Sequence, residues 1–301
     1  MAAGASVSLT GWMDIRELND RKSGRRVSVV VPALDDEDTV AGVVASVKPL
    51  LGGLVDELIV LDAGSADRTI ARARAAGAEV YTREQALPGV AIRPGKGEVL
   101  WRSMAVCTGD LIVFLDADLI EPDPMFVPTL LAPLLTDPQI TLVKGFYRRP
   151  MTDDVDGGGR VTQLMARPLL TALAPALAEI IQPLGGECAT TRAFLGQISI
   201  ASGYGAEIGI LLDCWQRRGL SAIAQVDLGI RVHRNRPTHE LAVMSRQVVA
   251  TLLDRLGIRD SGIGLVQFLP EETGWRRTPS EVSLADRPPM SRRIAEYRDI
   301  A

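Results

Sequence analysis

The chain has 301 residues, of which 47% are hydrophobic and 23% are charged, and its formal net charge is -4. This is the composition of a globular protein, and it excludes a disordered chain. The acidic balance argues against a general nucleic-acid binder, which would need a basic face, but it is compatible with a local site for an anionic substrate.

The cysteines and the apolar runs indicate the cellular compartment of the protein. Its three cysteines (Cys107, Cys188 and Cys214) are far apart and form no CxxC pair, so we expect buried free thiols rather than disulfides or a zinc site. The first residues lack the basic and apolar segments of a signal peptide. No apolar run approaches the roughly 18–20 residues that span a bilayer. We therefore expect a soluble protein of the cytoplasm.

The elements at the start of the chain are the clearest. Residues 1–26 are mixed in composition, and we expect an arm or cap that Trp12 could anchor. The run VSVVVPA at 27–33 is typical of a strand buried on both faces. An acidic cluster at 35–38 then opens a helix that runs to about Leu51, because acidic groups suit a helix N-terminus.

Further strands and helices alternate after this first pair. Strands are predicted at 57–63, 78–82, 109–119 and 140–149, and a helix begins at about Asp67. Alternation over 27–135 predicts an α/β fold with a mostly parallel, doubly wound sheet. Ligands of such sheets bind beyond the carboxyl ends of the strands, and those ends carry Pro32, Asp62 and Asp116.

The second half of the chain has a different pattern. We expect a flexible, acidic, glycine-rich loop at 151–160 and a helical stretch to about Ile181. A loop leads into an amphipathic helix over 203–220, a strand at 224–235 ends in a basic loop, and a helix covers 240–256. The tail after Pro270 is rich in proline and charge, and it either wraps the surface or is partly disordered.

The segment Asp116-Ala117-Asp118 is the strongest candidate for a metal site. It follows five apolar residues, and strand alternation places the two carboxylates on the same side. Two oxygen ligands one residue apart suit Mg²⁺ or Mn²⁺ and leave further coordination to phosphates and water. The alternative is that the two residues only begin a turn.

Two other strand ends carry candidate nucleotide contacts. Asp62, before Ala63 and Gly64, could bond a ribose hydroxyl or a base; alternatively, its neighbours cap the next helix. A second group lies where the first strand ends, and its alternative is an acidic helix N-terminus. This group comprises Pro32, Ala33, Leu34 and Asp36.

Basic and glycine-rich segments offer contacts to anions. Lys96 lies between two glycines just before a helix and could contact an anion, or it could be an ordinary exposed lysine. Glycines 157–159 with Arg160 and Thr162 could hold a phosphate or carboxylate, which Arg grips bidentately; the alternative is a flexible linker with a capping threonine.

One acidic residue and two histidines complete the candidates. Glu207 follows two loop glycines and could accept hydrogen bonds from a sugar or acceptor hydroxyl, or it could only complement a helix dipole. His233, in RVHRN, could bind a metal or touch a phosphate, whereas we expect His239 to be a surface residue.

Taken together, these segments carry a family resemblance over roughly residues 11–290. The chain closely resembles the actinobacterial glucosyl-3-phosphoglycerate synthases, which are retaining glycosyltransferases of the GT-A fold. The resemblance lies in the runs VVVPALDDEDTV, VDELIVLDAGSADRT, REQALPGVAIRPGKGEVLWRS, LVKGFYRRP, GGGRVTQL, SGYGAEIGILLD, VHRNRP, MSRQVVATLL and LADRPPM.

The resemblance implies transfer of glucose from UDP-glucose to the 2-hydroxyl of 3-phosphoglycerate, on the pathway towards methylglucose lipopolysaccharides, by a homodimer that uses Mg²⁺ or Mn²⁺. It also implies a division of the chain into an arm (1–26), a nucleotide-sugar part (27–150), an acceptor part (151–270) and a tail (271–301). Two positions depart from the family pattern, since Ala63 replaces a usual serine and the acidic motif is DAD rather than DSD. The loop before Gly157 also looks shorter than in mycobacterial members.

Residue roles carried over from the family fall into four groups. The donor would contact Pro32, Ala33, Leu34, Asp36, Asp62, Ala63, Lys96, Asp116, Ala117 and Glu207. The acceptor would contact Gly159, Arg160, Thr162, Tyr204 and Asn235. The metal would be bound by Asp118, His233 and Asp116, and catalysis would depend on Glu207, Asp116 and Lys96.

Other functions are kept as alternatives. A related family branch uses GDP-mannose, and the motifs do not separate it firmly. A nucleotidyltransferase would show a basic, glycine-rich loop after the first strand, where this chain has Leu34-Asp35-Asp36-Glu37. A non-catalytic nucleotide-sugar-binding protein would have little need for an intact aspartate pair. A membrane-bound lipid glycosyltransferase is disfavoured because no basic amphipathic helix is present.

Overall fold

A seven-stranded mixed sheet forms the centre of the computed structural model, which describes residues 14–149, 159–231, 237–282 and 285–292. The strand order is β3-β2-β1-β4-β6-β5-β7. The strands are β1 Val27–Ala33, β2 Glu57–Asp62, β3 Glu79–Thr82, β4 Leu111–Phe114, β5 Leu142–Arg148, β6 Cys188–Thr191 and β7 Ile223–Ile230.

Most neighbours in this sheet are parallel. β1 pairs in parallel with both β2 and β4, β2 with β3, and β5 with β7. β6 runs antiparallel to β4 and β5, between which it lies. The predicted mostly parallel α/β sheet is therefore confirmed, and the carboxyl ends of β1, β2, β4, β5 and β7 lie along one edge.

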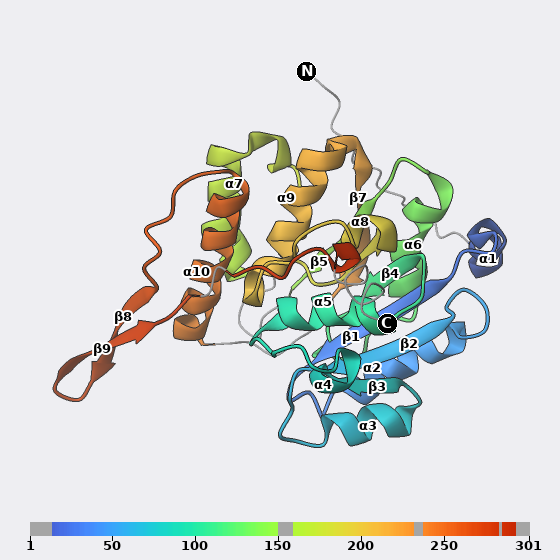
Figure 1. The fold of residues 1–301 in the computed structure, drawn as a ribbon, viewed down its shortest axis with the longest axis horizontal. Helices are drawn as coiled ribbons and strands as arrows, with labels where there is room; N and C mark the ends of the chain where they lie inside the picture. The colour runs from blue at the N-terminus through green and yellow to red at the C-terminus, as the bar shows by residue number, and fades with distance from the viewer. Residues whose placement is uncertain (1–13, 150–158, 232–236, 283–284, 293–301) are drawn as a thin grey trace.

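Helices cover both faces of the sheet (Figure 1). The α-helices are α1 Ile15–Lys22, α2 Val40–Val47, α3 Thr69–Ala76, α4 Arg83–Ala86, α5 Lys96–Val106, α6 Phe126–Thr136, α7 Arg167–Leu173, α8 Arg192–Leu195, α9 Ala206–Arg218 and α10 Thr238–Arg255. Shorter helical turns are η1 Lys48–Leu50, η2 Thr162–Ala166, η3 Pro175–Leu177, η4 Gly203–Gly205 and η5 Leu220–Ala222.

The alternation of side chains along β1 separates two halves of the core. Val29 and Val31 pack on one face of the sheet with the apolar residues of α2 and α6. Val30 points to the other face, where it joins a cluster that includes residues of α5 and α9. Both faces of β1 are thus buried, which explains why its sequence is a continuous apolar run.

The predicted N-terminal arm contains a helix that packs on the core. Asp14 caps α1 by accepting a hydrogen bond from the backbone of Arg16. Leu18 is buried in the core, and Nζ of Lys22 lies 2.7 Å from Oδ2 of Asp56. Trp12 lies outside the described residues.

The C-terminal part contains a two-stranded sheet that the sequence did not indicate. β8 Leu265–Glu271 and β9 Gly274–Ser280 form an antiparallel hairpin, which crosses the boundary expected at residue 270. Figure 1 shows the hairpin projecting from the body of the molecule. Beyond the hairpin, Arg287 and Met290 are buried. This part of the tail therefore packs against the body of the protein, which agrees with the expectation that the tail wraps the surface. Among the described helices, none combines the length and apolarity that a membrane crossing requires.

Candidate active site

The N-terminus of α5 brings Lys96 against the start of α9. The helix begins after Gly95, whose φ is +98°. A Cβ atom on Gly95 would lie 2.5 Å from Cα of Gly203, so two glycines allow the two loops to touch. This close approach joins the segment before Lys96 to the turn that leads into Glu207.

Lys96 connects two carboxylates at the carboxyl edge of the sheet. Its Nζ donates to Oδ1 of Asp116, which follows β4, and lies 2.7 Å from Oε1 of Glu207 in the first turn of α9. All three side chains are largely buried. The structure therefore favours the interpretation of Lys96 as a site residue over that of an ordinary exposed lysine.

Arg231 is a second cation in this cluster, and sequence reasoning missed it. It follows the end of β7, and its Nη2 lies 2.7 Å from Oδ2 of Asp116 and 3.0 Å from Oδ1 of Asp118. Its Nε lies 3.1 Å from Oε1 of the buried Glu187, before β6. The signal that could have found Arg231 is its place at the carboxyl end of a predicted strand, on the edge that Asp116 already marked.

Charge in this cluster favours the ionised forms of Lys96 and Asp116. Burial lowers the pKa of Lys96, but the carboxylates of Asp116 and Glu207 outweigh burial and hold it well above its ordinary value. Burial raises the pKa of Asp116, but Lys96 and Arg231 bring it well below its ordinary value. Within these ion pairs, Lys96 and Arg231 contact four carboxylates, and the charge of Arg149 also lowers the pKa of Asp116.

Gly186 has no side chain, and the carboxylate of Asp116 and the ammonium of Lys96 occupy the space that a side chain there would fill. A Cβ atom at Gly186 would lie 2.3 Å from Oδ1 of Asp116 and 2.6 Å from Nζ of Lys96. Both distances are below any normal contact, and the two groups it would meet are held by ion pairs. The glycine before Glu187 is therefore part of the site.

The two aspartates have the chemistry of a site for a divalent cation. Asp116 and Asp118 converge on a single nitrogen of Arg231, which shows that both carboxylates can reach one cationic centre. Among the described residues, no group of three or more His, Cys, Asp and Glu side chains is arranged to hold a metal ion. Two carboxylates that reach one cationic centre nevertheless fit Mg²⁺ or Mn²⁺, with phosphate and water as further ligands. His233 lies outside the described residues.

The expected nucleotide contacts surround the ends of β1 and β2. Asp62 is buried, and its carboxylate accepts hydrogen bonds from the backbone of Gly64 and Ser65 and from the Ser65 hydroxyl. Asp62 thus fixes the turn after β2 through its own carboxylate, and contact of this segment with a nucleotide remains a prediction. Leu34 is exposed at the end of β1, where its backbone N–H donates to Asp36.

The expected acceptor contacts are described in part. Nη1 of Arg160 donates to Oγ1 of Thr238, the first residue of α10, at 3.3 Å. Thr162 is buried in η2, and Gly159 precedes Arg160 with φ of +76°. Tyr204 lies in η4, and its backbone N–H donates to Gln247 of α10. Asn235 lies outside the described residues, and His239 is exposed as expected.

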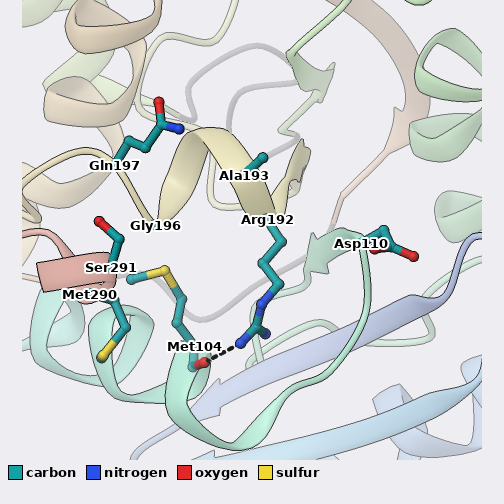
Figure 2. Close-up of a pocket in the computed structure, with 8 residues that line it drawn as sticks. All are labelled: Met104, Asp110, Arg192, Ala193, Gly196, Gln197, Met290 and Ser291. Atoms are coloured by element: carbon teal, nitrogen blue, oxygen red, sulfur yellow. Dashed lines mark hydrogen bonds between the residues drawn. The ribbon is translucent and has the colours of Figure 1, made fainter. Parts of the chain in front are cut away.

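A separate hollow of about 430 Å³ lies at the opposite end of β4 (Figure 2). Asp110, just before β4, and Arg192, just after β6, contribute to its lining. The guanidinium of Arg192 donates to the backbone oxygens of Met104 and Cys107, so its charge is engaged by the fold. The hollow therefore lacks the converging charged groups of the carboxyl edge.

Known proteins resemble this chain closely. Residues 28–171 match the model of Glycosyl transferase family 2. The glucosyl-3-phosphoglycerate synthase of Mycolicibacterium smegmatis is 61% identical over 281 residues, which cover 92% of this chain and 93% of that protein.

Solved structures agree with this relationship. The glucosyl-3-phosphoglycerate synthase of Mycobacterium tuberculosis in complex with Mn²⁺, uridine-diphosphate-glucose and phosphoglyceric acid has a TM-score of 0.89 and 56% identity, and the match covers 96% of this chain and 98% of that chain. The same enzyme with Mg²⁺ and uridine-diphosphate has a TM-score of 0.90, at the same identity and coverage. The resemblance expected from the sequence is confirmed, and the chain belongs to the glucosyl-3-phosphoglycerate synthases, a family of GT-A glycosyltransferases.

Proposed function

We propose that this chain transfers glucose from UDP-glucose to the 2-hydroxyl of 3-phosphoglycerate and retains the anomeric configuration. The observation that carries the proposal is the convergence of Lys96, Arg231 and the Asp116–Asp118 pair at the carboxyl edge of the sheet. A relative that is 56% identical over 96% of this chain has been solved with uridine-diphosphate-glucose and phosphoglyceric acid bound. This complex supports the assignment of both substrates.

The central demand of the reaction is the departure of UDP, which gains negative charge as the glycosidic bond breaks. Lys96 stays protonated because two carboxylates raise its pKa, and it would stabilise the leaving diphosphate from one side. Arg231 would act in the same way from the other side, since its guanidinium is held at the same edge. A divalent cation held by Asp116 and Asp118, with His233 as a further ligand, would supply Lewis-acid neutralisation of the diphosphate when bound.

The remaining donor contacts follow the same edge. We place the uridine against Pro32, Ala33, Leu34 and Asp36, and the segment from Asp62 to Ala63 beside it. These residues lie at the carboxyl ends of β1, which is next to β4, and of β2, which is next to β1. Asp116 and Ala117 lie where the diphosphate and sugar would meet. Glu207 would accept hydrogen bonds from hydroxyls of the glucose, and Lys96 fixes its orientation.

The acceptor is itself an anion and needs cationic contacts. Arg160 would bind its phosphate or carboxylate in a bidentate manner, supported by the Gly159 amide, the Thr162 hydroxyl, Tyr204 and Asn235. Glu207 and Asp116 both interact with Lys96, which lowers their nucleophilicity, so a covalent glycosyl-enzyme of the retaining glycosidase type is disfavoured. We infer attack on the same face as the departing UDP, with a phosphate oxygen of the donor taking the proton.

The substrate assignment is tested by a matrix of donors and acceptors. UDP-glucose, GDP-glucose, UDP-mannose and GDP-mannose are each incubated with 3-phosphoglycerate and Mg²⁺, and the product is identified by mass. We expect the highest kcat/KM with UDP-glucose. Preference for GDP-mannose would reassign the donor, and donor binding without any turnover would favour a non-catalytic nucleotide-sugar-binding protein.

We also propose that the protein is a homodimer of the cytoplasm. The three described cysteines are free and buried, as expected where thiols stay reduced. One face of the β8–β9 hairpin exposes two large aromatic side chains beside Arg277, with Phe268 60% and Trp275 71% accessible. A two-stranded sheet is marginally stable alone, so a second copy covering this face would stabilise it.

The dimer is tested by light scattering after size exclusion. We expect the mass of two chains for the wild type and of one chain for Trp275→Asp combined with Phe268→Asp. A wild-type monomer would contradict the proposal, and a dimer that survives both substitutions would place the interface elsewhere.

A further inference from the structure

Glu187 is a buried carboxylate with no direct part in the chemistry proposed above. It directly precedes β6, and its side chain is 0% exposed. Neither of its carboxylate oxygens has an aligned hydrogen-bond donor among the described residues. A buried carboxylate is unfavourable unless an opposite charge compensates it. The compensating charge is Arg231, whose Nε lies 3.1 Å from Oε1 of Glu187, close enough for an ion pair but off the N–H direction.

The guanidinium of Arg231 is held from three sides. Its Nε side faces Glu187, and its Nη1 donates to the phenol oxygen of Tyr147 at 3.2 Å. Its Nη2 faces Asp116 and Asp118 at the site. Opposite ends of one cation therefore contact a buried carboxylate behind the site and the two carboxylates that form it.

We propose that Glu187 is a positioning residue that shares the charge of Arg231 and so leaves Asp116 and Asp118 available to a divalent cation. A guanidinium whose only counter-ions were the two aspartates would hold their oxygens more tightly, and a metal ion would compete for the same atoms. Because Glu187 also attracts the guanidinium, it weakens the hold of Arg231 on the oxygens of the two aspartates. The inference rests on the proposed function, because it concerns the use of the aspartate pair by a metal.

The electrostatics of the cluster agree with this division of charge. Burial lowers the pKa of Arg231, but Glu187 is the largest of the attractive contributions that raise it well above its ordinary value. Tyr147 does not replace Glu187 as a counter-ion, because burial, with the charge of Glu187, raises the pKa of its phenol to about 12. At neutral pH the phenol is uncharged, and the guanidinium contacts the side chains of Glu187, Asp116 and Asp118.

The test measures Mn²⁺ binding rather than turnover alone. Mn²⁺ is titrated into the full chain with saturating UDP and followed by calorimetry, for the wild type and for Glu187→Gln. We expect the Kd for Mn²⁺ to rise about tenfold or more, since removal of one member of a buried charge pair has large effects. The KM for 3-phosphoglycerate should stay within about twofold, because Arg160 is not among the contacts of Arg231.

Asp213→Asn is the matched control. Asp213 is also buried and also pairs with an arginine, Arg255, whose Nε lies 3.0 Å from its Oδ2. Both variants should lower Tm, because each removes one carboxylate counter-ion of a buried arginine. Only Glu187→Gln should weaken Mn²⁺ binding, and equal weakening in both variants would show a general loss of structure and overturn the proposal.

A double-mutant cycle with Arg231→Gln tests whether Glu187 acts through Arg231. In the Arg231→Gln background, Glu187→Gln should cause no further change in the Kd for Mn²⁺. Fully additive effects, or an unchanged Kd in Glu187→Gln alone, would overturn the proposal. If the wild type binds Mn²⁺ and UDP but transfers no glucose, the proposed function fails while this inference stands.

Glu187→Asp serves if Glu187→Gln does not fold. It keeps the buried charge and withdraws the carboxylate from Arg231 by one methylene. We then expect a smaller rise in the Kd for Mn²⁺ that disappears in the Arg231→Gln background. An unchanged Kd in Glu187→Asp would count against the proposal.

Discussion

The ammonium of Lys96 lies 2.7 Å from Oε1 of Glu207, so the first turns of α5 and α9 meet in one ion pair. The same ammonium donates to Asp116 at the end of β4. One lysine therefore fixes a carboxylate placed for the sugar and a carboxylate placed for the diphosphate. Its loss should disturb both at once.

Lys96→Met should lower kcat by about 10²–10³-fold, because it removes a preorganised cation at the leaving group, an effect of about 3–4 kcal/mol. Steady-state kinetics at saturating Mg²⁺ measure it. Lys48→Met is the control, since Lys48 is exposed and reaches only the backbone oxygen of Ala76. A Lys96→Met enzyme with wild-type kcat would remove Lys96 from the mechanism.

Gly186→Ala should abolish activity while much of the fold survives. The added Cβ would meet the carboxylate of Asp116 and the ammonium of Lys96 at under 3 Å, which separates the ion pair. Activity and Tm are both measured, with Gly42→Ala in α2 as the control. Gly42 has open space around its Cβ position, and alanine favours a helix, so this change should raise stability by about 0.5–1 kcal/mol. Full activity in Gly186→Ala would show that Asp116 and Lys96 can shift to accommodate the added methyl group without loss of function.

Arg160→Ala should raise the KM for 3-phosphoglycerate about tenfold or more and change the KM for UDP-glucose little, because a bidentate anion contact is lost. Initial rates with each substrate varied in turn separate the two constants. Arg217→Ala, on the exposed side of α9, should change neither. Equal increases in both constants would contradict an acceptor role for Arg160.

The pH dependence of stability should be flat around neutrality. The folded pKa of Asp116 is lowered, so its contribution is present above the ordinary value of 3.8 and is lost as the pH falls below it. The folded pKa of Lys96 is raised, so its contribution is present below 10.5 and is lost only as the pH rises beyond that value. The Tm difference between wild type and Asp116→Asn should stay constant from about pH 5 to 9. A difference that titrates near pH 7 would show that Asp116 is not held ionised in this way.

The sequence predicted the parts of the fold that depend on local patterns. The strands β1, β2 and β4 are continuous apolar runs, and the rule that ligands bind at carboxyl ends placed Asp116 and Asp118 at the site. β6 was not predicted, because CATT is short and follows two glycines, and only pairing with β4 and β5 makes it a strand. The hairpin β8–β9 escaped notice because its proline- and arginine-rich segments resemble a tail.

The buried ion pairs of the site could not be predicted from the sequence to the same extent. Arg231 lies 115 residues from Asp116, and Glu187 and Tyr147 are ordinary residues until the fold brings their segments together. Sequence patterns report which residues face a core, but not which buried charges share a counter-ion. For Asp62 the strand-end position predicted a ligand contact, but it did not predict that the carboxylate also fixes the turn beside it.

We infer that the carboxylates at the end of β4 make sugar transfer depend on a divalent cation. The most direct measurement is the rate of glucosyl-3-phosphoglycerate formation by wild type and Asp118→Ala, each with Mg²⁺ and with a chelator. We expect rapid product formation only for wild type with Mg²⁺, and loss of transfer in Asp118→Ala at every Mg²⁺ concentration. Undiminished turnover in Asp118→Ala, or equal wild-type rates with Mg²⁺ and with chelator, would contradict it.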